Sequence, residues 1–147
     1  MASLVTRDVL QRRMRYLAVA TIRLTNDLPR TRAADVIGRQ LVRAVTSVAA
    51  NYRAACRARS RREFVAKMGI VEEEADETAF WLELLDDCAL APTACIAPLT
   101  RESGELLAIT VASIRTARMG RGVSRANPHS AIRNPQSAEP QCSSTAR

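Results

Sequence analysis

The sequence predicts an all-α protein that folds as an antiparallel up-down-up-down four-helix bundle. Apolar residues make up 47% of the 147 residues. They recur at alternating spacings of three and four, which is the period of a helix. Glycine is scarce, with only Gly38 and Gly69 before residue 104, and no stretch keeps the alternation of a strand. Because aromatic residues account for only 3% of the chain, alanine, leucine, valine and isoleucine must build the core.

The first helix is expected from about Ser3 to Asp27. Its apolar positions, spaced by four and three residues, form one seam: Leu10, Met14, Leu17, Thr21, Leu24 and Leu28. Pro29 ends the helix, because proline cannot donate to the helical hydrogen-bond ladder and disfavours helix at the preceding residue.

The second helix is expected from an N-cap at Thr31 to about Ala58. Its apolar line consists of Ile37, Leu41, Ala44, Val45, Val48, Tyr52, Ala55 and Cys56. Asn51 lies within this apolar neighbourhood. It is therefore either a buried amide that bonds across the bundle or an exposed amide, and both readings stay open.

Residues 60–63 read Ser-Arg-Arg-Glu, a capping box that starts the third helix. In this motif the Ser60 hydroxyl accepts from the Glu63 amide, and the Glu63 carboxylate returns to the Ser60 amide. The apolar stripe that follows is Phe64, Met68, Val71, Ala75, Thr78, Leu82 and Leu85. Phe80 and Trp81 lie beside this stripe, which indicates either a subunit contact or a broader core face.

The fourth helix is expected from about Thr93 to Met119, ended by Gly120 and Gly122. Its apolar members are Leu99, Leu106, Leu107, Ile109, Val111 and Ile114. Pro98 either sits in the first turns of this helix or divides the segment into a short turn and a helix.

Two regions follow from these boundaries. Residues 1–120 form the single bundle domain. Residues 121–147 are rich in proline, serine and asparagine and show no periodicity, so we expect a disordered basic tail.

The charge is unevenly distributed along the chain. The net charge is +7, yet residues 1–62 hold 14 arginines and 3 acids, whereas residues 63–120 hold 4 basic residues and 11 acids. The basic excess favours an anionic partner such as nucleic acid or a membrane surface. The split also suits pairing between oppositely charged helices, within one chain or between chains.

No residues point to catalysis or to metal binding. The chain has one histidine, His129, in the tail, and its four cysteines lack the spacing of metal ligands. Neither a di-iron bundle nor a histidine-activated nucleophile fits, so we expect no enzyme, no catalytic residue, no metal and no cofactor. Cys56 and Cys88 fall within helical apolar patterns and are expected as buried thiols.

The sequence also lacks membrane signals. No apolar run approaches the roughly 20 residues that cross a bilayer, and the first residues do not show the pattern of a signal peptide. We therefore expect a cytoplasmic protein with no membrane partner.

The centre of the chain resembles the bacterial four-helix bundle family first found in intervening sequences of large-subunit ribosomal RNA genes. The resemblance covers about residues 10–118 and is most specific in four groups of residues. These groups are Gln40, Leu41, Arg43, Ala44, Ser47 and Asn51; Arg57, Arg59, Arg61 and Arg62; Ser60, Glu63 and Phe64; and Glu74, Glu77, Thr78, Trp81 and Leu82.

The resemblance implies an antiparallel bundle that assembles as a ring-like homopentamer. It also implies kinship with the accessory variability determinant proteins of diversity-generating retroelements, which are basic pentamers that bind nucleic acid and the element's reverse transcriptase. Where many relatives read Asn-Ile-Ala-Glu-Gly, this chain reads Asn-Tyr-Arg-Ala-Ala at residues 51–55. It therefore lacks that glutamate and gains an arginine.

These observations lead to a functional hypothesis, a non-enzymatic oligomeric accessory protein that contacts RNA or DNA phosphates and assists a reverse transcriptase. The expected phosphate-binding residues are Arg53, Arg57, Arg59, Arg61, Arg62, Arg12, Arg13 and Arg15. The alternative is a structural or protein-interaction bundle with no nucleic-acid role. In that case many of these arginines would pair with the acidic run between Glu72 and Glu77.

Overall fold

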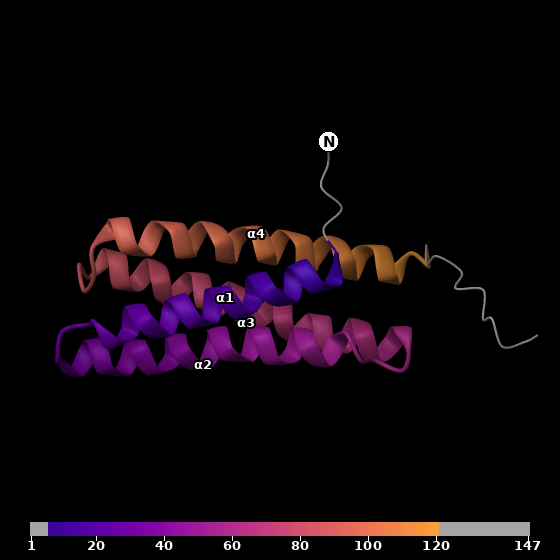
Figure 1. Ribbon diagram of the computed structural model, residues 1–147, viewed down its shortest axis with the longest axis horizontal. Coiled ribbons are helices and arrows are strands. Elements are labelled where there is room, and N and C mark those ends of the chain that lie inside the picture. Colours follow the sequence, from indigo (N-terminus) through magenta and orange to yellow (C-terminus); the bar gives the residue numbers. More distant parts are fainter. Residues whose placement is uncertain (1–5, 121–147) are drawn as a thin grey trace, which may run out of the picture.

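The computed structural model describes residues 6–120, which form four helices and no strand (Figure 1). The helices are α1 (Arg7–Asn26), α2 (Arg32–Ala55), α3 (Arg61–Asp87) and α4 (Thr93–Arg118). Each helix packs against two neighbours in ring order, whereas the diagonal pairs α1/α3 and α2/α4 do not meet. Short connections make consecutive helices antiparallel. The predicted antiparallel four-helix bundle is confirmed.

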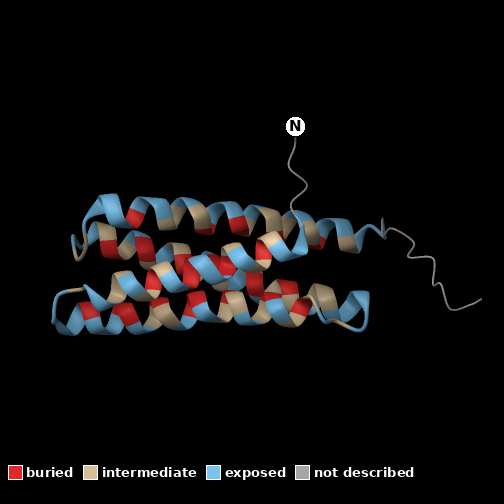
Figure 2. Cartoon of the chain, viewed as in Figure 1, coloured by how far each residue is buried: buried red, intermediate tan, exposed pale blue. Residues whose placement is uncertain are grey.

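The core runs along the whole bundle as one buried face on each helix (Figure 2). The spacing of apolar residues predicted most of this face on α1, α2 and α3. The largest of its members that are fully buried are Met14, Leu17, Leu41, Met68, Leu82 and Leu85. Burying a side chain of this size contributes roughly 1.5–3 kcal/mol, so this face holds the bundle together.

The core line of α4 differs from the expected one. Its buried residues are Ile96, Ser103, Leu106, Thr110 and Ile114, and the predicted Leu99, Leu107, Ile109 and Val111 are only half-buried. Ser103 Oγ donates to the Ala75 carbonyl oxygen of α3 at 3.1 Å, and Thr110 donates to the Leu106 carbonyl oxygen at 2.8 Å. These bonds let polar residues occupy core positions that an apolar pattern does not reveal.

Pro98 lies inside α4, which runs without a break from Thr93 to Arg118. Of the two arrangements expected from the sequence, the one with Pro98 in the first turns of a continuous helix is therefore confirmed. Before it, Pro92 is the N-cap and offers no side-chain cap. Thr93 Oγ1 instead donates to Asp86 Oδ1 at 2.6 Å and ties the start of α4 to the end of α3.

Two boundaries around the α2–α3 connection differ in detail from the expected ones. α2 ends at Ala55 rather than near Ala58. At the start of α3, Ser60 Oγ accepts from the Glu63 amide at 3.1 Å, as a capping box requires. The Glu63 carboxylate, however, accepts from the Arg59 amide at 2.8 Å rather than from Ser60, so the return bond reaches one residue further back.

The structure decides the environment of Asn51, which is half-buried and so matches neither open reading fully, and corrects that of Cys88. Asn51 does not bond across the bundle; its Nδ2 donates to the carbonyl oxygen and to Oγ of Ser47, one turn earlier in α2, each at 3.0 Å. Cys88 is exposed, because it caps the C-terminus of α3 beyond the last core position, whereas Cys56 is half-buried.

α1 begins at Arg7 rather than near the expected Ser3, because Thr6 is an extended N-cap whose hydroxyl accepts from the Val9 amide. The expected tail, residues 121–147, lies outside the described residues. Across residues 6–120, none of the helices combines the length and the apolar character needed to span a bilayer.

Candidate nucleic-acid interface

The antiparallel topology brings four helix termini to one end of the bundle: the starts of α1 and α3 and the ends of α2 and α4 (Figure 1). We call this end the basic end. Its described basic side chains are Arg7, Arg53, Arg57, Arg59, Arg61, Arg62, Arg115 and Arg118, and Asp8 is the acidic residue in the first turn of α1. Glu63 is the acidic residue among the first residues of α3, and its carboxylate accepts the Arg59 amide.

The five arginines predicted around the α2–α3 connection are exposed and unpaired. Within residues 6–120, no carboxylate oxygen lies within 4.0 Å of a guanidinium nitrogen of Arg53, Arg57, Arg59, Arg61 or Arg62. The expected alternative, pairing with the acidic run of α3, therefore does not occur for these five within one chain. Their guanidinium groups are available to an external anion.

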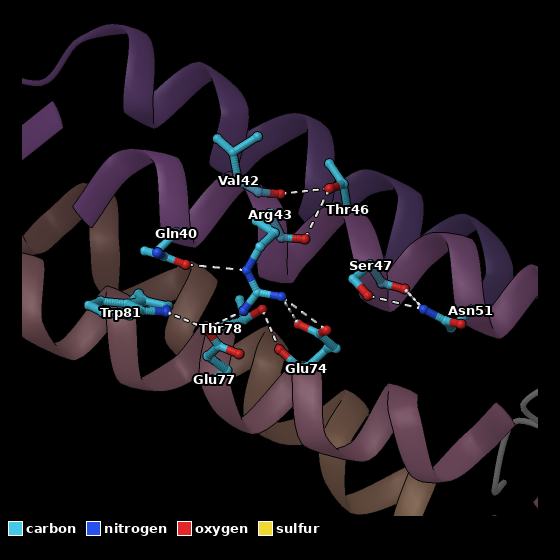
Figure 3. Close-up of polar contacts among 10 residues, drawn as sticks. All are labelled: Gln40, Val42, Arg43, Thr46, Ser47, Asn51, Glu74, Glu77, Thr78 and Trp81. Atoms are coloured by element: carbon cyan, nitrogen blue, oxygen red, sulfur yellow. Dashed lines mark hydrogen bonds and ion pairs between the residues drawn. The ribbon is translucent and has the colours of Figure 1, made fainter. Parts of the chain in front are cut away.

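Two residues of the acidic run, Glu74 and Glu77, pair instead with Arg43, in the middle of α2 (Figure 3). Arg43 Nη1 contacts the two carboxylate oxygens of Glu74 at 3.2 and 3.3 Å, and Nη2 donates to Glu77 Oε1. Gln40 Oε1 accepts from Arg43 Nε at 3.2 Å, and Trp81 Nε1 donates to Glu77 Oε1 at 3.0 Å. Most of the polar residues that carry the family resemblance on α2 and α3 thus form a network that joins the two helices.

Hydrogen bonding within this network shifts two acid–base equilibria. The Arg43 guanidinium, followed by the Trp81 indole N–H, lowers the pKa of the Glu77 carboxyl below its ordinary value of 4.5. The Glu77 carboxylate in turn raises the pKa of Arg43. Both shifts favour the charged pair.

The predicted arginines of α1 divide into two kinds. Arg12 and Arg15 are exposed. Arg13 is engaged with α4: its Nε and Nη2 donate to Glu102 at 2.7 and 2.8 Å, and Nη2 also donates to Glu105 at 2.7 Å. The bond to Glu102 raises the pKa of Arg13, which is partly buried. A phosphate would have to displace two carboxylates to reach it.

Sequence reasoning missed Arg115 and Arg118, which lie in the last turn of α4. They are separated by some fifty residues from the α2–α3 connection, and only the topology places them at the same end. Arg61 reaches toward them, because its Nη1 lies 3.4 Å from the position that a Cβ would take on Gly120. Basic residues are common in the last turn of a helix, because they interact favourably with the helix dipole. The sequence therefore offered no sign that these two arginines belong to a binding surface.

No metal site accompanies this surface. In the part of the chain that the structure describes, no group of three or more histidine, cysteine, aspartate or glutamate side chains is arranged to hold an ion. The guanidinium groups of the basic end are hydrogen-bond donors with fixed positive charge.

Comparisons with known proteins agree with the fold and with the family resemblance. The model of the family described as "23S rRNA-intervening sequence protein" matches residues 7–112. A crystal structure from Bacteroides thetaiotaomicron, described as a protein with unknown function from the S23 ribosomal protein family, is 30% identical, with a TM-score of 0.69. The similarity covers 75% of this chain and 98% of that one. No curated protein matches the chain.

Proposed function

The chain belongs to the 23S rRNA-intervening sequence protein family, and on that premise we propose that it is a non-enzymatic, oligomeric protein that binds RNA or DNA phosphates through its basic end. The observation that carries this proposal is the unpaired state of the five arginines around the α2–α3 connection. Arg115 and Arg118 extend the same surface across α4.

The physical reason lies in the phosphate backbone. An arginine that contacts a phosphate releases condensed counterions, which provides affinity without reading the base sequence. Since these guanidinium groups have no carboxylate partner within residues 6–120, no ion pair has to break first. In an oligomer each copy repeats the surface, and linked weak contacts bind more tightly than one.

The test is a titration of the full chain against short labelled RNA and DNA duplexes at several salt concentrations. For duplex DNA the slope of log affinity against log salt is about −0.9 per phosphate contact. The triple variant Arg59→Gln/Arg61→Gln/Arg62→Gln removes up to three contacts, so we expect weaker binding and a slope shallower by roughly 2.7.

A matched control separates the basic end from net charge. Arg30→Gln/Arg32→Gln/Arg101→Gln removes the same charge from exposed positions away from the basic end, and we expect a smaller loss. Equal losses in the two variants would assign binding to overall charge. Undetectable wild-type binding at about 50 mM salt would overturn the proposal.

A second candidate is a structural or protein-interaction bundle with no nucleic-acid role. The exposed ring of Phe80, 53% accessible on the outside of α3, favours a protein contact. The same titration discriminates between the candidates, because this one predicts no salt-dependent binding.

The proposal extends to partners and place of action. The family resemblance favours a homopentamer, a reverse transcriptase as protein partner and a cytoplasmic location. Light scattering gives the mass of the assembly as a multiple of 16.1 kDa. Co-purification of the chain with a co-expressed reverse transcriptase tests that protein partner, and failure to co-purify would restrict the partners to nucleic acid and other copies.

A further inference from the structure

α1 carries a second stripe of residues that faces away from the core. Arg12, Tyr16, Val19 and Arg23 recur at spacings of four, three and four, so they share one face of the helix. Tyr16 is 70% exposed and Val19 is 39% exposed. This α1 stripe is therefore apolar in its middle and basic at both ends.

α3 carries a corresponding stripe of opposite charge. Ile70, Glu73, Glu77, Phe80 and Leu84 recur at spacings of three, four, three and four. The Phe80 ring packs edge-on against Trp81, with ring centroids 4.9 Å apart. This contact holds the exposed Phe80 ring in place, as is typical of an aromatic anchor at a protein interface.

Apart from Glu77, which accepts from Arg43 and Trp81, the charged residues on the two stripes are unpaired within the described chain. Among residues 6–120, no carboxylate lies within 4.0 Å of Arg12 or Arg23, and no basic group lies that close to Glu73 or to the neighbouring Asp76. Each stripe thus offers the charge that the other lacks.

A groove beside the α1 stripe could receive an aromatic ring. It runs between α1 and α4, and its lining residues include Tyr16, Leu17, Pro98 and Leu99. Arg12 and the Arg13–Glu102 ion pair also line the groove, and Arg12 is the charged residue among them without a partner in the described chain. The apolar floor suits an aromatic ring, and the basic group beside it suits carboxylates that flank the ring. Phe80 on α3 fits this description, because Asp76, Glu77 and Glu83 lie three or four residues from it along the helix.

The two stripes lie on opposite sides of the molecule, because α1 and α3 are diagonal in the bundle and do not meet. One chain therefore cannot bring them together. A contact between the α1 stripe of one copy and the α3 stripe of the next is head-to-tail, and repeated head-to-tail contacts close into a ring when the rotation between copies permits.

We infer that the α3 stripe of one copy docks on the α1 stripe of a second copy, with Phe80 in the groove beside Tyr16 and with the unpaired acids Glu73 and Asp76 facing the arginine at one end of the α1 stripe. This inference rests on the self-association in the proposed function and deepens it by naming the two surfaces. It leaves the arginines of the α2–α3 connection free for phosphates.

The first experiment measures the mass of the full chain by light scattering. We expect a multiple of 16.1 kDa for the wild type and the mass of one chain for both Tyr16→Glu and Phe80→Glu. Both side chains are more than half exposed, so the helical content seen by circular dichroism should not change. Met119→Glu, which alters another exposed apolar side chain outside both stripes, should keep the wild-type mass.

The second experiment mixes the two variants in equal amounts. Tyr16→Glu keeps an intact α3 stripe and Phe80→Glu keeps an intact α1 stripe, so one junction can form and a 1:1 dimer should appear. The other junction sets two carboxylates against each other and stays open. A symmetric contact of α3 with α3 would instead let Tyr16→Glu assemble alone.

Three results would overturn the inference: a wild-type chain with the mass of one copy at all concentrations, variants that keep the wild-type mass, or a mixture without dimers. The nucleic-acid titration gives a separate outcome. A ring that binds no RNA or DNA refutes only the phosphate-binding role, and a monomer that binds them refutes only the docking of the two stripes.

Discussion

Four hydroxyl side chains are buried in the core, at Thr21, Thr78, Ser103 and Thr110. Three of them donate to backbone carbonyl oxygens, at distances of 2.7 to 3.1 Å. Thr21 Oγ1 is different, because it is fully buried and has no hydrogen-bond partner among residues 6–120. A buried polar group without a partner is destabilising, since it has lost its bonds to water and gained none.

We therefore predict that Thr21→Val stabilises the protein. Valine has nearly the same shape, and removing the unpaired hydroxyl should raise the free energy of unfolding by about 1 kcal/mol. Urea denaturation monitored by circular dichroism measures this change as a higher midpoint at an unchanged m-value. The matched control Thr110→Val removes a hydroxyl that is bonded, so it should not stabilise. A lower midpoint for Thr21→Val would contradict the prediction.

At the scale of elements, α2 and α3 are joined by the network around Arg43 as well as by their apolar faces. Glu77 accepts from both Arg43 and Trp81, and these bonds lower the pKa of its carboxyl from 4.5. A carboxyl whose pKa is lower in the folded state stabilises that state at higher pH. Its contribution is present above the ordinary pKa and disappears as the pH falls through the folded-state pKa.

The prediction at the scale of elements concerns how thermal stability changes in acid. Glu77→Gln should melt below the wild type near neutral pH, by a few degrees at most, because the network is partly exposed. The difference in melting temperature should shrink as the pH falls below 4.5. Glu83→Gln is the control, since Glu83 is exposed and has no basic partner within residues 6–120. A difference that stays constant down to low pH would refute this role of Glu77.

At the scale of the whole molecule, α1 is the helix that closes the bundle. It is the shortest of the four, and it packs less extensively against α4 than α3 does. The Arg13 guanidinium, with its bonds to Glu102 and Glu105, is the polar link across this weaker seam. Elements with fewer contacts open at lower free energy than the rest of a fold.

Hydrogen exchange should therefore reveal α1 as the first helix to open. We expect Arg13→Gln to speed exchange in α1 by severalfold more than in α2 or α3, because it removes the ion pairs to α4 but no core contact. Mass spectrometry of peptides from each helix measures this. Arg15→Gln, an exposed arginine of the same helix without a carboxylate partner in the described region, should leave exchange unchanged. A uniform increase in all four helices would show that Arg13 supports global stability instead.

The sequence by itself determined the four helices, their order and most of the core, because helical periodicity and caps are local properties of the chain. Met14, Leu41 and Leu82 lie where their spacing predicts, and Ser60 caps α3 as its motif requires. The buried Ser103 escaped that pattern, because its place in the core depends on a carbonyl oxygen of another helix.

Only the tertiary structure decided which arginines are free. Arg12 and Arg13 are adjacent in the sequence, yet Arg13 is held by two carboxylates about ninety residues away and Arg12 by none in the described chain. Likewise, Arg43 pairs with Glu74 and Glu77, two of the acids that the alternative reading paired with the arginines of the α2–α3 connection. Ion pairing depends on which faces of distant helices meet, and that is a property of packing rather than of local sequence.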